Sequence, residues 1–388
     1  MTQTRTGPRT RATGEPEMSN PFMNLADRFF GRGQYAVTIP AMDGPLLPNS
    51  LLDAAHLVEQ IAEPDNLAVL GDRTYFTSGR CVYRLNNGSQ KAERVEEFPA
   101  EITALAARSD GRFAACLSNG SVAVWEEGRK PQTIHDLSKR RLTCLTSVAH
   151  GNGDEIYVTN GSLSNGPKGW AKDLLEKNAS GSVWRLDAGN GSCTELAKGL
   201  GFPAGVMADG GQLVVSEAWR HQLLSIDLAA TQRPRAILAD LPAYPSRIVK
   251  ATDGYWLCLF APRSQLIEFV LREEAYRRRM MEEVAPQFWI APALRSGDSF
   301  LEPLQGGGVK RMGILKPWAP TRSYGLVVKL DRTFQVLESF HSRADGVRHG
   351  ITSVVEINGS AIVTSKGGNA ILAFDAPRTR ENRNAARH

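Results

Sequence analysis

One pattern recurs along most of this chain: a turn with Asp, Asn or Gly, a short run of β-branched and aromatic residues, a second turn, and an alternating strand. Its first strand occurs six times, in the segments 70–78, 109–118, 153–160, 209–217, 252–260 and 357–365. Its second strand also occurs six times, beginning at Cys81, Ser121, Ser182, Gln222, Gly325 and Asn369. The number and spacing of these units constrain the fold more than any other feature.

The spacing of the units suits small sheets of four strands. Gly71 and Gly111 lie 40 residues apart, Gly111 and Gly153 lie 42 apart, and Gly210 and Gly254 lie 44 apart. Four strands of about five residues each, with turns, fill such a period. Each small sheet needs a neighbour on both faces, which radial packing provides. The pattern therefore predicts an all-β fold, a six-bladed β-propeller; a β-sandwich or two small β domains is the alternative.

The domain organisation follows from where the pattern starts, stops and is interrupted. Residues 1–20 and 376–388 are polar and rich in arginine, which predicts disordered tails around a propeller at 21–375. Residues 161–180 and 262–323 interrupt the third and fifth units. A propeller closes when one terminus completes the blade begun by the other, and the alternating segment Gln34 to Ile39 is the predicted outer strand of the last blade.

Both insertions contain helical patterns. The segment WAKDLLEK at 170–177 predicts a short helix, and residues 265–284 predict a longer one. Its apolar residues at near-helical spacing are Leu266, Phe269, Val270, Tyr276, Met280 and Val284. We expect a helix on the rim of the propeller; a cationic lid or a membrane-surface contact is the alternative.

Composition excludes several classes of protein. The formal net charge of +5 comes largely from the ends, and no basic stripe indicates nucleic-acid binding. No apolar run is long enough to span a bilayer, and the first residues lack the apolar segment of a secretory signal. The five cysteines include no CxxC pair, which predicts free thiols in a reducing, cytoplasmic environment.

Three segments in order resemble the strictosidine-synthase-like propellers. These are GPLLPNSLLDAAHLVEQIAEPDNLAV at 44–69, LGFPAGVMADGGQLVVSEAW at 200–219 and DLPAYPSRIVKATDGYWLCLFAPR at 240–263. The resemblance runs from about Gly33 to Asp375. It implies a six-bladed propeller from a family that includes a condensing enzyme and, in related branches, calcium-dependent lactonases and esterases.

The resemblance also implies which residues surround the axis. In metal-binding relatives a Glu, two Asn and an Asp hold the axial ion, and the matching positions here are Ala62 or Glu63, Thr143, Ala204, and Ser246 followed by Arg247. Because calcium requires hard oxygen ligands, we expect no metal and no cofactor. We expect Arg247 to pair with an acid such as Asp65 or to await an anionic ligand group.

Candidate catalytic residues are few. The resemblance places Thr352 where the condensing enzyme has its glutamate, and His349 near one of that enzyme's histidines. Asp65 and Asn66 lie on the first inner strand, where an acid near the axial mouth could act as a base, although turn residues need no function. We take Asp65 and His349 as candidate bases, and Arg247, Ser246, Thr143, Thr352 and Asn66 as candidate ligand-binding residues.

Two functions remain open at this point. The first is a metal-independent enzyme acting on a small organic molecule, anionic ones included, by lactone or ester hydrolysis or by condensation. The second is a noncatalytic propeller that binds a small molecule or a protein partner at its axial mouth.

Overall fold

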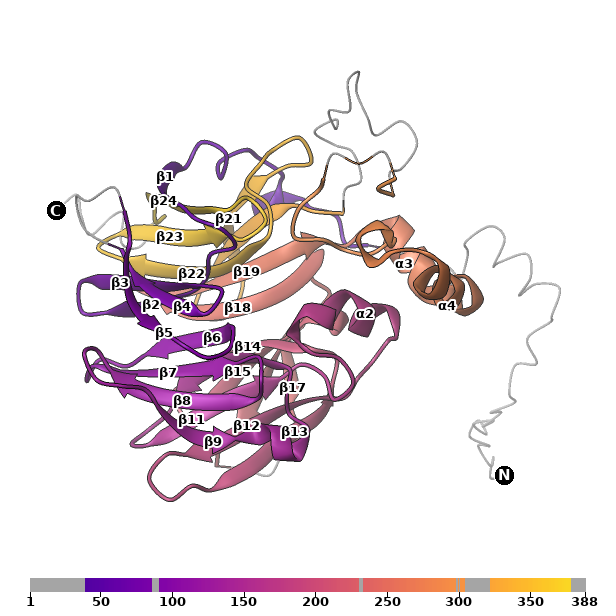
Figure 1. Cartoon of the computed structure of the whole chain (residues 1–388). Coiled ribbons are helices and arrows are strands. Elements are labelled where there is room, and N and C mark those ends of the chain that lie inside the picture. Colours follow the sequence, from indigo (N-terminus) through magenta and orange to yellow (C-terminus); the bar gives the residue numbers. More distant parts are fainter. Residues whose placement is uncertain are drawn as a thin grey trace, which may run out of the picture. The chain divides into compact units, whose positions relative to one another are not determined.

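Six antiparallel sheets of four strands form the fold, which confirms the predicted propeller (Figure 1). The computed structural model describes residues 39–85, 91–229, 233–297, 299, 301–303 and 322–377. The predicted tails therefore lie almost wholly outside the described residues, as does the predicted propeller start at residue 21. Among the described residues, no helix is long and apolar enough to span a membrane.

Blades 1 to 3 follow one another along the chain. Blade 1 contains β2 (Asp65–Leu70), β3 (Arg73–Ser78), β4 (Cys81–Arg84) and β5 (Glu93–Glu97). Blade 2 contains β6 (Ile102–Ala107), β7 (Arg112–Leu117), β8 (Ser121–Glu126) and β9 (Gln132–Asp136). Blade 3 contains β10 (Leu145–His150), β11 (Glu155–Asn160), β12 (Gly181–Asp187) and β13 (Cys193–Leu200).

Blades 4 to 6 complete the ring. Blade 4 contains β14 (Pro203–Asp209), β15 (Gln212–Glu217), β16 (Gln222–Asp227) and β17 (Arg235–Leu238). Blade 5 contains β18 (Ala243–Ala251), β19 (Gly254–Pro262), β20 (Gly325–Leu330) and β21 (Val336–Ser342). Blade 6 contains β22 (Ile351–Ile357), β23 (Ser360–Ser365), β24 (Ala370–Asp375) and β1 (His56–Gln60). The repeated segments of the sequence are the second and third strands of these blades.

The ring closes through β1, not through the predicted strand at Gln34 to Ile39. β1 pairs antiparallel with β24, with His56 opposite Ala373 and Gln60 opposite Ala370. Residues 34–38 lie outside the described residues, and Ile39 is not in a strand. The principle of closure was right, but the strand was wrong, because the segment His56–Gln60 occupies the edge of β24.

Apolar side chains fill all six interfaces between neighbouring blades. At the interface of blades 4 and 5, Val214 and Leu223 pack against Leu257 and Val328. The innermost strands β2, β6, β10, β14, β18 and β22 each contact the next, and β22 contacts β2. Burying one such side chain stabilises the fold by about 1.5–3 kcal/mol. Packing between the faces of neighbouring blades therefore stabilises the ring in addition to the backbone hydrogen bonds within each sheet.

The two insertions form helices at one end of the ring (Figure 1). They are α2 (Trp170–Leu175), α3 (Gln265–Arg272) and α4 (Glu274–Glu283), with short 3-10 turns at Pro167–Gly169 and Pro286–Phe288. Further 3-10 turns outside the insertions lie at Gly44–Leu46, Leu137–Arg140 and Ala218–Arg220. The single helix predicted for 265–284 was wrong: the chain leaves helical geometry at Glu273. Val270 and Met280 are buried, whereas Phe269 and Tyr276 are both 52% exposed.

The segment before β1 is part of the core, which gives a direct test of closure. Leu52 is fully buried in the cluster between blades 5 and 6, and its N–H donates to the His341 carbonyl at 3.0 Å. We expect Leu52→Ala to lower the free energy of unfolding by about 2–5 kcal/mol because it leaves a cavity. The neighbouring Leu51→Ala should change it by less than about 0.5 kcal/mol, since Leu51 is 44% exposed. Urea unfolding measures both; equal values would contradict this account.

Candidate active site at the propeller axis

Every innermost strand is irregular near its start. The pairing register shifts between Asp65 and Ala68, Ile102 and Ala104, Leu145 and Ser147, Pro203 and Gly205, Pro245 and Ile248, and Ile351 and Ser353. A bulge takes the extra residue out of the ladder and leaves its backbone groups without strand partners. Such carbonyl groups need other hydrogen-bond donors when they are buried.

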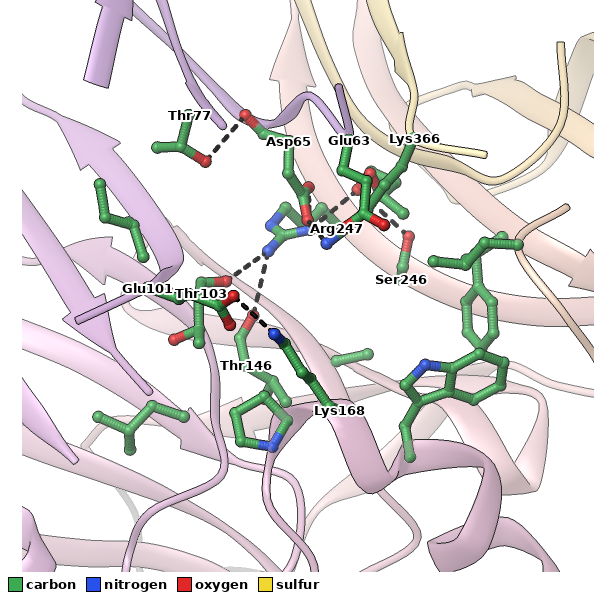
Figure 2. Close-up of a pocket in the computed structure, with 18 of the residues that line it drawn as sticks. Glu63, Asp65, Thr77, Glu101, Thr103, Thr146, Lys168, Ser246, Arg247 and Lys366 are labelled. Carbon is green, nitrogen blue, oxygen red and sulfur yellow. Dashed lines mark hydrogen bonds and ion pairs between the residues drawn. The ribbon is translucent and has the colours of Figure 1, made fainter. Parts of the chain in front are cut away.

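Arg247 supplies those donors. Its Nη1 donates to Asp65 Oδ1 at 2.9 Å and to the Thr352 carbonyl at 3.2 Å. Its Nη2 donates to the Thr103 carbonyl at 2.8 Å and to the Thr146 carbonyl at 3.4 Å (Figure 2). Arg247 belongs to blade 5 and its partners belong to blades 1, 2, 3 and 6, so one guanidinium group connects five blades.

Asp65 is the counter-ion of two cations. Its second oxygen, Oδ2, lies 3.0 Å from Lys366 Nζ, and Oδ1 also accepts the Asn66 N–H at 2.8 Å. Burial raises the pKa of Asp65, but the charges of Arg247 and Lys366 outweigh burial and hold this pKa at about 2. Asp65 is therefore ionised at neutral pH and is a weak base.

A cavity of about 460 Å³ opens beside this charged group (Figure 2). Its charged lining residues are Glu63, Asp65, Glu101, Lys168, Arg247 and Lys366, and its hydroxyl-bearing ones are Thr77, Thr103, Thr146, Ser246 and Thr352. Lys168 pairs with Glu101 at 2.6 Å at an exposed position. In the described part of the chain, the carboxylate of Glu63 has neither a hydrogen bond nor an ion pair.

The rest of the lining is apolar and comes from both insertions and from blades 2 to 5. It consists of Ile102, Leu145, Pro167, Trp170, Phe202, Ala204, Phe260 and Leu294, with Gly79 at the edge. The Trp170 ring meets Phe260 edge to face, with centroids 5.4 Å apart. The cavity is thus charged on one part of its wall and aromatic on another.

The structure brings together some of the predicted site residues and separates others. Asp65, Ser246, Arg247 and Thr352 line the cavity, and the predicted pairing of Arg247 with Asp65 is present. Thr143 lies before β10 and does not line the cavity formed by the described residues. The residue of that segment at the axis is Thr146, three positions later.

Asn66 and His349 are also away from the cavity. Asn66 is fully buried, and its Nδ2 donates to Thr77 Oγ1 at 2.7 Å. His349 Nε2 donates to the Arg343 carbonyl at 2.8 Å, and its Nδ1 lies 2.9 Å from Ser323 Oγ. Burial lowers the pKa of His349, and both of its ring nitrogens are engaged with protein groups. The structure therefore does not support His349 as a base facing the pocket.

Several lining residues escaped the sequence analysis. Thr103 and Thr146 share a signal with the predicted Thr352 that was available, because each of the three follows an Ile or Leu at the start of an inner strand, in ITAL, LTSV and ITSV. Lys366 lies in a KGGN turn between β23 and β24, and nothing local distinguishes this lysine from a solvent-exposed one.

Comparisons with known proteins agree with this architecture. Residues 77–283, just over half of the chain, match the SMP-30/Gluconolactonase/LRE-like region. The chain belongs to this family. A calcium-binding protein, regucalcin from Agrobacterium tumefaciens, has a similar solved structure at 12% identity and a TM-score of 0.51, covering 82% of this chain and 92% of its own. A gluconolactonase from Xanthomonas campestris aligns at 12% identity and a TM-score of 0.52, covering 87% of this chain and 97% of its own. No curated protein matches.

The axis of this SMP-30/gluconolactonase-like chain does not fit a divalent cation. Arg247 and Lys366 already place two positive charges there, and Asp65 uses both oxygens on them. The side chain of Ala204 offers no ligand atom, and calcium needs six or more oxygen ligands. Within the described ranges, no three His, Cys, Asp or Glu side chains gather as metal ligands would. Instead, the guanidinium group donates hydrogen bonds to the three carbonyl groups around it, so these carbonyl groups do not need a metal ion as their partner.

The low pKa of Asp65 predicts a pH dependence. Its folded-state pKa lies below the ordinary value of 3.8, so its ion pairs stabilise the fold fully above pH 3.8 and lose this contribution as pH falls toward 2. The contribution is about 2 kcal/mol at neutral pH. We expect Asp65→Asn to lower the free energy of unfolding by about this amount at pH 7 and by less at pH 3, in urea titrations. The exposed Asp72→Asn is the control; a pH-independent difference for Asp65→Asn would contradict this prediction.

Proposed function

We propose that this protein hydrolyses a lactone or ester of a small organic molecule in its axial cavity, with fixed side-chain cations in place of a divalent metal ion. The observation that carries this proposal is the position of the Arg247 guanidinium group. It lies at the axis, where the inner strands converge, together with Asp65 and Lys366. Membership of a family that includes gluconolactonases supports the reaction class.

Lys366 is the cation that can meet a substrate. Its ammonium group carries three N–H donors, one of which is used on Asp65, and its side chain is 28% exposed. A substrate carbonyl beside it gains negative charge as water adds, and a positioned cation stabilises that oxyanion. The terminal N–H groups of Arg247 are all engaged, so Arg247 and Asp65 are positioning residues that hold Lys366 in place.

Glu63 is the proposed general base. Its carboxylate lines the cavity, and its N–H donates to Asn369 Oδ1 at 3.0 Å, in the same turn that carries Lys366. Glu63 takes a proton from water as the water oxygen attacks the acyl carbon. The acyl C–O bond then breaks, and the protonated Glu63 returns its proton to the leaving alkoxide, which gives a hydroxy acid from a lactone.

The other functions considered differ in what they require. A strictosidine-synthase-like condensation would need a carboxylate where Thr352 lies. Thr352 has a hydroxyl group instead, which lies 3.2 Å from the Thr364 hydroxyl group. A noncatalytic propeller that binds a small molecule or a protein partner requires no base. Binding without turnover is the result that would favour it.

A panel of lactones and aryl esters tests the proposal, assayed in excess chelator and in millimolar calcium. We expect turnover that is equal in both conditions. Lys366→Met and Glu63→Gln should each lower kcat/KM by roughly 100-fold, because each removes a group that acts in the transition state. Lys139→Met, at an exposed position, should leave kcat/KM unchanged. Two results would reject the proposal: turnover that requires calcium, or no turnover of any substrate in the panel.

A further inference from the structure

The hydroxyl groups that line the cavity are already used within the protein. Thr77 Oγ1 accepts from Asn66, and Thr146 Oγ1 donates to the Pro203 carbonyl at 2.5 Å. The remaining bonds join Thr103 to the Cys116 carbonyl at 3.2 Å, Ser246 to the Cys258 and Thr352 carbonyls at 3.4 Å, and Thr352 to Thr364. These groups join strands and blades to one another, and because their O–H donors are engaged, they offer a ligand rich in hydroxyl groups acceptor oxygens only.

The apolar wall is built and held in place by both insertions. Trp170 begins α2, and the fully buried Asp173 of that helix accepts the Trp219 indole N–H at 2.8 Å. Trp219 stacks on Phe202, with centroids 4.7 Å apart. A polar contact with a buried acceptor therefore holds this part of the wall in place.

The second insertion closes the same wall. Its residue Leu294 lines the cavity, and a Cβ atom added at Gly367 would overlap the Leu294 carbonyl oxygen. The insertion thus packs directly on the turn that carries Lys366. The two insertions also share one apolar cluster, in which Leu175 packs with Val270 and Met280.

We infer that the cavity selects lactones and esters with an apolar, aromatic or alicyclic body and one carbonyl head, in preference to polyhydroxylated sugar lactones. The body lies against Trp170, Phe202 and Phe260, and the head meets Lys366. A sugar ring would lose its hydrogen bonds to water against this wall and find few replacements among the engaged hydroxyl groups. The inference names the substrate class of the reaction proposed above and rests on that function.

Binding measurements test the inference separately from catalysis. The probes are 3-phenylpropionate and gluconate, which carry the same single charge and resemble the products of an aryl and a sugar lactone. By calorimetry on the full chain, we expect 3-phenylpropionate to bind at least tenfold more tightly than gluconate. Gluconate binding that is equal or tighter, or no binding of 3-phenylpropionate, would overturn the inference.

Variants of the wall make the test specific. Trp170→Ala should weaken 3-phenylpropionate binding roughly tenfold, and Trp170→Phe should retain most of the affinity. Phe269→Ala is the matched control, since Phe269 lies on the second insertion but is 52% exposed and does not line the cavity. Thermal unfolding shows whether each variant is folded. An unchanged affinity in folded Trp170→Ala contradicts the inference, whereas retained binding without hydrolysis of dihydrocoumarin rejects the proposed function alone.

Discussion

The guanidinium group of Arg247 donates to a carboxylate and to three backbone carbonyl groups from four other blades, and the centre of the ring depends on these contacts. The bulges in the inner strands free the carbonyl groups, and a cation at the axis makes their convergence favourable. Asp65 neutralises part of that charge and holds Lys366 at the edge of the cavity. Fold closure and site chemistry therefore share one electrostatic arrangement.

Local patterns in the sequence predicted the blades well because strand alternation and Gly/Asp turns are properties of short segments. The closing strand was missed, since the choice between residues 34–39 and β1 depends on pairing with β24, more than 300 residues away. The axial register was missed for a related reason. Thr143 precedes β10, whereas Thr146 lies at the bulge of that strand and lines the cavity, and this register depends on the pairing of β10 with β11. The pairing of Arg247 with Asp65 could be predicted because a buried guanidinium requires an acid.

The insertions distinguish this chain's cavity from the bare mouth of a propeller. Trp170 from the first and Leu294 from the second line the cavity, and of its charged residues only Lys168 comes from an insertion. The sequence predicted helices in both insertions but not their contact, because the cluster around Leu175 and Val270 forms only when the two segments meet over the ring. The reaction class proposed from the family and the ligand class inferred from this wall thus rest on different observations.

A double-mutant cycle between Arg247 and Asp65 tests the central claim most directly. Unfolding free energies of the wild type, Arg247→Met, Asp65→Asn and the double variant give the coupling between the two side chains. If the guanidinium acts as the built-in cation of the axis, the coupling is about 2 kcal/mol or more, and the double variant is less destabilised than the sum of the single variants. A coupling within about 0.5 kcal/mol of zero would show that the two charges do not depend on each other, and would contradict the account.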